Sequence, residues 1–530
     1  MNQKSPLLIA PTTLKQWVHD GCEIALLDVR EHGQYGEEHL FYVVSVPYSK
    51  LETEAERLVP RKQVRMVLVG DESGALTLKA SKRLAAIGYT NVHILDGGMP
   101  AWKKAGYEVF AGVNLPSKAF GELAEHAFNT PRISAKELNE KIQNNENLIV
   151  LDGRPFTEYK KMSIPTAMCC PNGELPLRID DIVTDPQTTI VINCAGRTRS
   201  IIGAQTLINL GIPNKVLALE NGTQGWYLED LKLDHGQTKK HSLSLGQKSL
   251  VERQTRAKSL AQKHGVKFVD SSTVEKWRQD NQRTTFICDV RTPEEYAQGT
   301  AQGAKHCPGG QLVQATDQYV GVKGARLVLV DAEGVRAPAM ASWLAMLGWD
   351  VSVWEHAFEI KLPDQNETSS ELPKQDVEEL LAGQIEAHLK TGALLVDLRP
   401  SMQYRLGHIK SAIWSVRPQL YQLAEKLKGF TVILLADDKN TAHLAAIDLK
   451  ELGVQDLYMN TQKLADWKAE NLPIEETPNN PPDAQCIDYL FFVHDRHDGN
   501  KAAARQYLAW EMNLLAQIDE KEKAAFKLPH

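Results

Sequence analysis

Short apolar runs recur along this chain, and each is followed by a small polar loop and then by a longer segment of mixed polarity. The run 189–192 precedes a loop that contains Cys194, and the helical pattern after it ends at Gly211, with Pro213 just beyond. A short apolar run bounded by turn residues is typical of a buried strand, and a glycine after a periodic segment is a helix stop signal. The pattern predicts a strand, a tight loop and a helix, in that order.

The same unit occurs three more times, at 66–88, 327–348 and 432–453. When the closing glycines are aligned, four residues share one loop position: Asp71, Cys194, Asp331 and Ala436. Each unit follows an apolar strand that ends in Asp-x-Arg, in the pairs Asp28/Arg30, Asp152/Arg154, Asp289/Arg291 and Asp397/Arg399. A single offset of 137 residues relates Asp152 to Asp289, Cys170 to Cys307 and Cys194 to Asp331. A shared offset at three landmarks predicts a fourfold internal repeat.

Each repeat has about 100 residues, an ordinary size for a domain. Helical patterns alternate with short apolar strands, which predicts α/β domains whose mostly parallel sheets carry helices on both faces. We expect domain 1 at 7–112, domain 2 at 131–236, domain 3 at 266–361, domain 4 at 374–476, and a C-terminal tail with a helix at 477–530.

Two connectors and one tail segment have patterns of their own. Residues 114–129 join domains 1 and 2, and the polar segment 237–265 is expected to be a helical connector. An amphipathic pattern at 501–518 predicts a helix that packs on the body of the protein or on a second subunit, so we keep a homodimer open.

Composition bears on the partners and on the cellular location of the protein. The chain has 60 Lys and Arg against 67 Asp and Glu, a net charge of −7, which argues against a nucleic-acid partner. No apolar run reaches the length of about 18 residues that a membrane helix needs, and the N-terminus lacks a signal-peptide pattern, so we expect no membrane span. Seven cysteines, an odd number, do not predict a disulfide framework and suit the reducing cytoplasm.

Several motifs resemble those of the rhodanese superfamily. The loop 194–200 reads Cys-x-Gly-x-x-Arg-Ser, and the fourth repeat has Tyr-x-x-Gly-His-Ile at 404–409. Late glycine motifs with a tryptophan stand at 96–102 and 220–226. The resemblance covers about residues 7–475, and the layout is similar to large bacterial proteins with four rhodanese repeats known as thiosulfate sulfurtransferases. It implies transfer of sulfane sulfur through a cysteine persulfide, with no cofactor and no metal.

Cys194 is the candidate nucleophile, because only its repeat has a thiol at the loop position. A free thiol has a pKa near ~8.5. A helix N-terminus, inward-facing amides and the two arginines of the loop would favour the thiolate. The resemblance implies that the rest of the loop cradles the substrate: Ala195, Gly196, Arg197, Thr198, Arg199 and Ser200. Ser200 could equally be a helix cap.

The expected reaction has two halves. Cys194 takes sulfur from thiosulfate, or from a related anionic thiosulfonate or persulfide, and passes it to a thiol, to cyanide or to a sulfur-accepting protein. Three alternatives stay open: a persulfide carrier or scaffold with little free turnover, a buried core thiol, and a phosphatase. The loop 194–199 has the six residues that the resemblance associates with sulfur transfer, whereas the related dual-specificity phosphatases have one more.

The other three repeats are predicted to be catalytically silent, because Asp71, Asp331 and Ala436 cannot form a persulfide. We expect domain 1 to pack against domain 2 as an inactive partner that walls its pocket. The alternative for Asp71 or Asp331 is a vestigial anion-repelling or metal site.

A few further residues have two interpretations each. Cys169 or Cys170 could relay sulfur or pack in the core, and Glu174 could face the pocket or hold a turn. His494 and His497 could bind a metal, although an exposed turn is the simpler interpretation.

Overall fold

The computed structural model describes residues 6–246, 249–359, 372, 375–491 and 500–529. They form two compact units. Unit 1 contains domains 1 and 4, within 1–18, 24–112 and 366–492. Unit 2 contains domains 2 and 3 and the tail from residue 493 on, within 19–23, 113–365 and 493–530.

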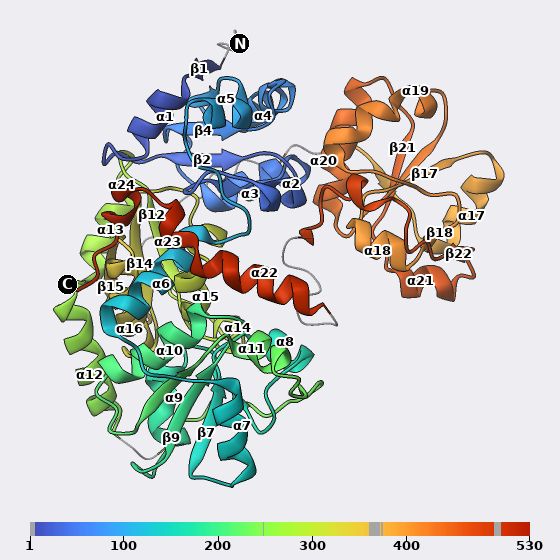
Figure 1. Ribbon diagram of the computed structural model, residues 1–530. Helices are drawn as coiled ribbons and strands as arrows, with labels where there is room; N and C mark the ends of the chain where they lie inside the picture. Colours follow the sequence, from blue (N-terminus) through green and yellow to red (C-terminus); the bar gives the residue numbers. More distant parts are fainter. Residues whose placement is uncertain (1–5, 247–248, 360–371, 373–374, 492–499, 530) are drawn as a thin grey trace. The chain divides into compact units, whose positions relative to one another are not determined.

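All four domains have the same five-stranded parallel sheet, as the alternating pattern predicted (Figure 1). Counted within its domain, the sheet order is first, fifth, fourth, second, third strand. Helices on both faces complete a doubly wound α/β fold.

Domain 1 has strands β1 (Leu7–Ile9), β2 (Ala25–Asp28), β3 (Val44–Ser45), β4 (Met66–Val69) and β5 (Val92–Leu95), with helices α1 (Pro11–Trp17), α2 (His32–Glu37), η1 (Tyr48–Lys50), α3 (Leu51–Leu58), α4 (Ala75–Ala86) and α5 (Gly98–Lys104). Domain 2 has strands β6 (Arg132–Ile133), β7 (Leu148–Asp152), β8 (Met168–Cys169), β9 (Thr189–Asn193) and β10 (Val216–Leu219), with helices α7 (Ala135–Gln143), α8 (Phe156–Lys161), α9 (Leu175–Ile182), α10 (Thr198–Asn209) and α11 (Gly222–Leu228).

Domain 3 has strands β11 (Lys267–Val269), β12 (Thr285–Asp289), β13 (Lys305–His306), β14 (Arg326–Val330) and β15 (Asp350–Trp354), with helices α13 (Ser271–Gln279), α14 (Pro293–Ala297), α15 (Gly309–Gln314), η2 (Thr316–Gln318) and α16 (Arg336–Met346). Domain 4 has strands β16 (Glu378–Glu379), β17 (Leu394–Asp397), β19 (Ile413–Trp414), β20 (Val432–Leu435) and β21 (Leu457–Asn460), an antiparallel pair β18 (His408–Ile409) and β22 (Ile474–Glu475), and helices α17 (Ala382–Lys390), α18 (Ser401–Leu406), η3 (Arg417–Gln422), α19 (Ala424–Leu427), α20 (Lys439–Glu451) and α21 (Leu464–Ala469).

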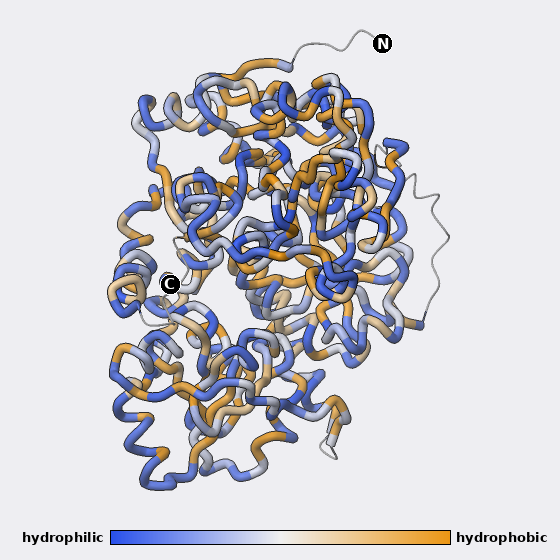
Figure 2. The backbone as a smooth tube through the Cα atoms, turned by 90° about the vertical axis from the view of Figure 1, so that its right-hand side faces the viewer, coloured by the Kyte–Doolittle hydropathy of each residue, from blue (hydrophilic) through white to orange (hydrophobic). Residues whose placement is uncertain are grey.

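The central strands are buried on both faces. In β9, Val191 faces one apolar cluster of domain 2, while Ile190 and Ile192 face the cluster on the other side of the sheet. This alternation follows from the two-residue period of a strand. In Figure 2 the apolar, orange stretches accordingly alternate with polar, blue ones along the backbone.

The Asp-x-Arg motif forms a buried ion pair in every domain. In domain 2, Nε and Nη2 of Arg154 donate to the two carboxylate oxygens of Asp152, at 2.9 and 2.7 Å. The same guanidinium donates to the carbonyl of Met162 at 2.6 Å. The paired arginine therefore ties the end of the second strand to the end of the next helix.

Within each unit, equivalent residues of the two domains meet each other. In unit 1, Glu52 pairs with Arg417 at 2.6 Å and Arg83 pairs with Asp448 at 2.6 Å. Both pairs are 365 residues apart, the offset that relates the loops of domains 1 and 4. A residue meets its own equivalent only beside a local twofold axis.

Unit 2 has the same kind of axis. Thr206 accepts a hydrogen bond from the indole of Trp343 at 2.8 Å, and these residues are equivalent positions 137 residues apart. A Cβ on Gly173 would come within 2.7 Å of the backbone nitrogen of its equivalent, Gly310. The two backbones therefore approach too closely for a side chain.

Domain 1, which was expected beside domain 2, instead shares a compact unit with domain 4, and domain 2 shares its unit with domain 3. The physical reason is the complementary charge of equivalent positions in domains 1 and 4, where a buried glutamate faces Arg417 and Arg83 faces a buried aspartate.

The helix expected within the connector 237–265 is α12 (Leu250–Lys263), which packs on α16. The connector between domains 1 and 2, for which no helix was predicted, contains α6 (Leu115–Phe128), which packs on α10. The tail has η4 (Asp483–Gln485), α22 (Lys501–Met512), α23 (Leu514–Gln517) and α24 (Glu520–Lys523), so the single helix expected at 501–518 is interrupted at Asn513. It packs on the body of unit 2, against α6 and α11. Within the described residues, no helix is both long and apolar enough to span a membrane.

Candidate active site

Cys194 directly follows β9, and α10 begins four residues later at Thr198. Its side chain is buried, with 1% of the residue exposed. The hydroxyl of Ser200 donates to the sulfur at 3.0 Å, and the thiol lies 3.8 Å from the carbonyl oxygen of Arg197. Ser200 is thus not the cap of the helix, because the cap position is Arg197; it contacts the candidate nucleophile instead.

The late glycine motif holds this loop from the other side. Gly222 has a φ of +52°, and a Cβ there would lie 2.2 Å from the carbonyl oxygen of Cys194. The amide of Thr223 donates to that carbonyl at 2.8 Å, and the amide of Gln224 donates to the carbonyl of Ala195 at 3.1 Å. The motif therefore fixes both carbonyls away from the sulfur.

Both loop arginines bind glutamates; Arg199 is buried and Arg197 is half-buried. Arg197 donates to Glu122 on α6 at 2.8 and 2.9 Å and also to Glu125. Arg199 donates to Glu158 on α8 at 2.8 and 2.9 Å. Burial alone would lower the pKa of Arg199, but the charge of Glu158 and, to a smaller degree, the nearby Cys194 raise it. The loop has two guanidinium groups, as predicted, but carboxylates already compensate both.

The loop of domain 3 has a carboxyl group, that of Asp331, in the cysteine position. One carboxylate oxygen of Asp331 accepts hydrogen bonds from the amides of Val335 and Arg336, both at 2.9 Å. Because burial outweighs these interactions, the pKa of Asp331 is raised. The offset of 137 residues makes these amides the equivalents of those of Thr198 and Arg199. In domain 3, two amides at the start of a helix therefore point at the side chain in the cysteine position.

The other two silent loops differ. Asp71 is exposed and accepts a hydrogen bond from Ser73 at 2.9 Å, and Ala436 is fully buried in the core of domain 4. Neither residue offers a nucleophile that could carry sulfur.

The lesser candidates are structural. Cys169 and Cys170 pack in the apolar clusters on the two faces of the domain 2 sheet. Burial raises the pKa of Cys169 to about 12 and that of Cys170 well above its usual value, so both remain thiols. Glu174 accepts hydrogen bonds from Arg178 at 3.1 Å and from Arg336 of domain 3 at 2.9 Å. It thus belongs to the contact between domains 2 and 3.

The tail supplies a residue that the sequence did not single out. Glu511 of α22 is 2% exposed, and its Oε1 accepts a hydrogen bond from the hydroxyl of Thr198 at 3.1 Å. Gly196 makes room for it, since a Cβ there would lie 3.1 Å from Oε2 of Glu511. The only sequence signal was the amphipathic tail, which says nothing about the surface that the helix covers.

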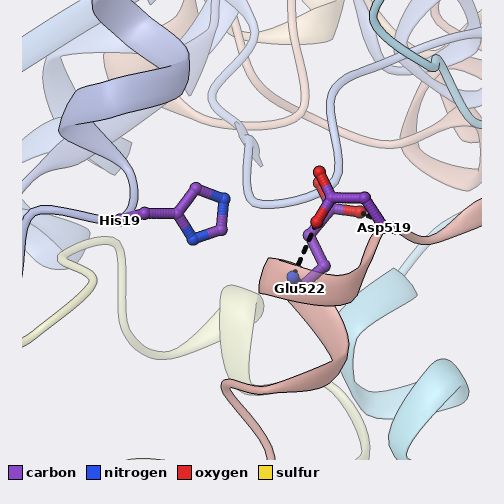
Figure 3. A group of neighbouring side chains, drawn as sticks. All are labelled: His19, Asp519 and Glu522. Carbon is purple, nitrogen blue, oxygen red and sulfur yellow. Dashed lines mark hydrogen bonds between the residues drawn. The ribbon is translucent and has the colours of Figure 1, made fainter.

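Among the described residues, one cluster of three side chains is close enough together to hold a metal ion. His19, Asp519 and Glu522 point toward one another with ligand atoms within 4.8 Å (Figure 3). The two carboxylates cap the N-terminus of α24, each accepting the other's backbone amide, at 3.0 and 2.8 Å. Capping accounts for their proximity. His494 and His497 lie outside the described residues.

Comparison with known proteins identifies relatives of this chain. The rhodanese-like domain family matches residues 10–105, 134–229, 271–359 and 381–470. The crystal structure of a thiosulfate sulfurtransferase from Pseudomonas aeruginosa is 36% identical and superposes with a TM-score of 0.90, covering 99% of each chain. YrkF of Bacillus subtilis is 29% identical over 28% of this chain and 86% of its own length. SseB of Mycobacterium tuberculosis is 28% identical over 22% of this chain and 50% of its own length.

Four doubly wound domains with one cysteine at the shared loop position define a tandem-repeat protein with a single thiol site. The chain belongs to the rhodanese-like domain family.

Proposed function

We propose that this chain is a sulfurtransferase that carries sulfane sulfur on Cys194. The observation that carries the proposal is the loop geometry. In domain 3 the same scaffold holds a carboxylate on two helix-start amides, and domain 2 has a thiol at that position with Arg199 and Ser200 beside it. Donors and positive charge of this kind suit a site at which an anionic sulfur donor binds.

The reaction proceeds in two steps. The Cys194 thiolate attacks the outer sulfur of thiosulfate, the bond between the two sulfur atoms breaks with its electron pair, and sulfite leaves. The product is the Cys194 persulfide anion. Cyanide or a thiolate then attacks the outer sulfur of this persulfide, and the Cys194 thiolate is regenerated as thiocyanate or a new persulfide leaves. A covalent intermediate of this kind predicts ping-pong kinetics.

The relatives support this class of reaction. The relative from Pseudomonas aeruginosa is a thiosulfate sulfurtransferase, and SseB is provisionally named one. YrkF is provisionally named a sulfur carrier protein, which favours the carrier as the second candidate. The burial of Cys194 also suits a carrier that releases its sulfur only to a selected partner.

Turnover distinguishes the two candidates. Pure protein is incubated with thiosulfate and cyanide, thiocyanate is measured, and Cys194→Ser is the control. We expect thiocyanate formation that depends on Cys194. A stable persulfide without turnover would favour the carrier, and Cys194-dependent hydrolysis of aryl phosphates would favour the phosphatase.

Setting and partners follow from the same chemistry. We propose a cytoplasmic location, because all seven cysteines are free and a reducing compartment keeps them so. The acceptor is proposed to be a thiol, cyanide or a sulfur-accepting protein. A homodimer also stays a proposal.

A further inference from the structure

The helix α22 of the tail lies over the Cys194 loop, beside α6 and α11 (Figure 1). Tyr507 and Glu511, one helical turn apart, both reach Gly196: a Cβ on this glycine would lie 3.6 Å from a ring carbon of Tyr507 and 3.1 Å from Oε2 of Glu511. The loop of domain 2 is therefore walled by the tail as well as by its own domain.

The carboxylate of Glu511 is incompletely satisfied. Its Oε1 accepts the hydrogen bond from Thr198, but Oε2 has no hydrogen-bond partner among the described residues. A buried carboxylate oxygen without a donor is costly to keep, so its presence calls for a functional explanation.

The nearest cations are shared with other carboxylates. The charge of Glu511 contributes to raising the pKa of Arg197, but Arg197 is bound by Glu122 and Glu125, and Arg199 is bound by Glu158. Lys118 donates to the hydroxyl of Tyr507 on α22. Burial raises the pKa of Glu122, partly offset by Arg197, and the charge of Glu511 raises it further. Glu511 therefore adds negative potential to a loop whose cations are already compensated.

We propose that Glu511 determines donor specificity by disfavouring dianionic thiosulfate relative to donors with one negative charge, such as organic thiosulfonates. This proposal rests on the proposed function of Cys194. With a thiosulfonate, the Cys194 thiolate attacks the outer sulfur, the bond between the two sulfur atoms breaks, and a sulfinate anion leaves. The persulfide formed is the same, and the difference between the leaving groups cancels when each donor is compared between protein variants.

The size of the effect follows from the charges. Repulsion by one carboxylate multiplies the loading rate by one factor per charge on the donor, so the factor for a dianion is the square of that for a monoanion. Glu511→Gln keeps the shape and an oxygen that accepts the hydrogen bond from Thr198. We expect it to accelerate loading on the order of threefold for methanethiosulfonate and on the order of tenfold for thiosulfate.

The experiment measures the rate constant of Cys194 persulfidation in the full chain by quenched-flow intact mass, with both donors. The variants are Glu511→Gln, Glu511→Asp, which perturbs packing but keeps the charge, and Glu520→Gln, which removes an exposed carboxylate of α24. The preference for the monoanion should fall about threefold in Glu511→Gln and persist in the other two.

Each other outcome counts against a specific claim. Equal acceleration of both donors, an unchanged ratio, or the same change in Glu511→Asp would refute a role for this charge while leaving Cys194 chemistry intact. Loading by neither donor in the unsubstituted protein would refute the proposed function, and the specificity proposal with it.

Discussion

Arg417→Met should destabilise unit 1 far more than the loss of an ordinary ion pair. The guanidinium of Arg417 is 2% exposed and donates to both carboxylate oxygens of Glu52, at 2.6 and 2.9 Å, and to the carbonyl of Tyr48 at 3.1 Å. Glu52 is fully buried, so the substitution leaves its charge without this cation. Asp448, in contrast, keeps Lys79 and Arg83.

Removing one partner of a buried ion pair costs about 3–5 kcal/mol. For a unit of this size, 1 kcal/mol shifts the unfolding midpoint by about 2–4 °C, so Arg417→Met should lower it by roughly 10 °C. Calorimetry of the full chain measures this shift. The double variant Glu52→Met with Arg417→Met should recover most of the loss, because an apolar pair can replace a buried ion pair at little cost.

The matched control is Lys103→Met, which breaks the exposed pair with Glu38 at 2.9 Å in the same domain. An exposed pair contributes about 0–1 kcal/mol. If Arg417→Met cost no more than Lys103→Met, or if the double variant were no more stable than the single one, the pairing of domains 1 and 4 by buried complementary charges would be wrong.

Three further predictions concern unit 2. Burial would raise the pKa of Glu295, but the hydrogen bonds and charge of Arg336 lower it to about 2. The stabilising contribution of the ionised Glu295 is therefore present above the ordinary carboxyl pKa and is lost as the pH falls toward 2. The unfolding of Glu295→Gln should depend less on pH in that window than the unfolding of the unsubstituted protein. Arg199→Met should slow persulfide formation more than Arg197→Met, because Arg199 interacts with Cys194 whereas Arg197 binds the two glutamates of α6; equal effects in a loading assay would contradict this. Cys169→Ala should leave thiocyanate formation within about twofold, because a buried protonated thiol is inert; a loss of turnover in a folded variant would restore the relay.

Much of the fold could be predicted from the sequence because its signals are local. The apolar runs, the Asp-x-Arg pairs and the constant offset between domains 2 and 3 identify the repeats, and each repeat folds around its own sheet. The Cys194 loop is equally local, since strand, loop and helix are consecutive. These features depend on neighbours within about one domain length.

The arrangement of the domains depends on contacts between distant segments. A usable signal existed, since equivalent positions carry opposite charges in Glu52 and Arg417 and again in Arg83 and Asp448. This signal becomes informative only when equivalent positions of two repeats are compared for opposite charge across a twofold axis, as well as for similar residues. Glu511 had no comparable signal, because its partner Thr198 is 313 residues away. The compensation of Arg197 was missed for the same reason, since Glu122 and Glu125 belong to a connector outside the domain.

The mass of the intact chain after incubation with thiosulfate tests the central claim most directly. The account predicts a gain of one sulfur atom, about 32 Da, located by peptide mapping on Cys194, removed by cyanide, and absent from Cys194→Ser. A gain that persists in Cys194→Ser, or no gain with thiosulfate or a thiosulfonate in the unsubstituted protein, would contradict it.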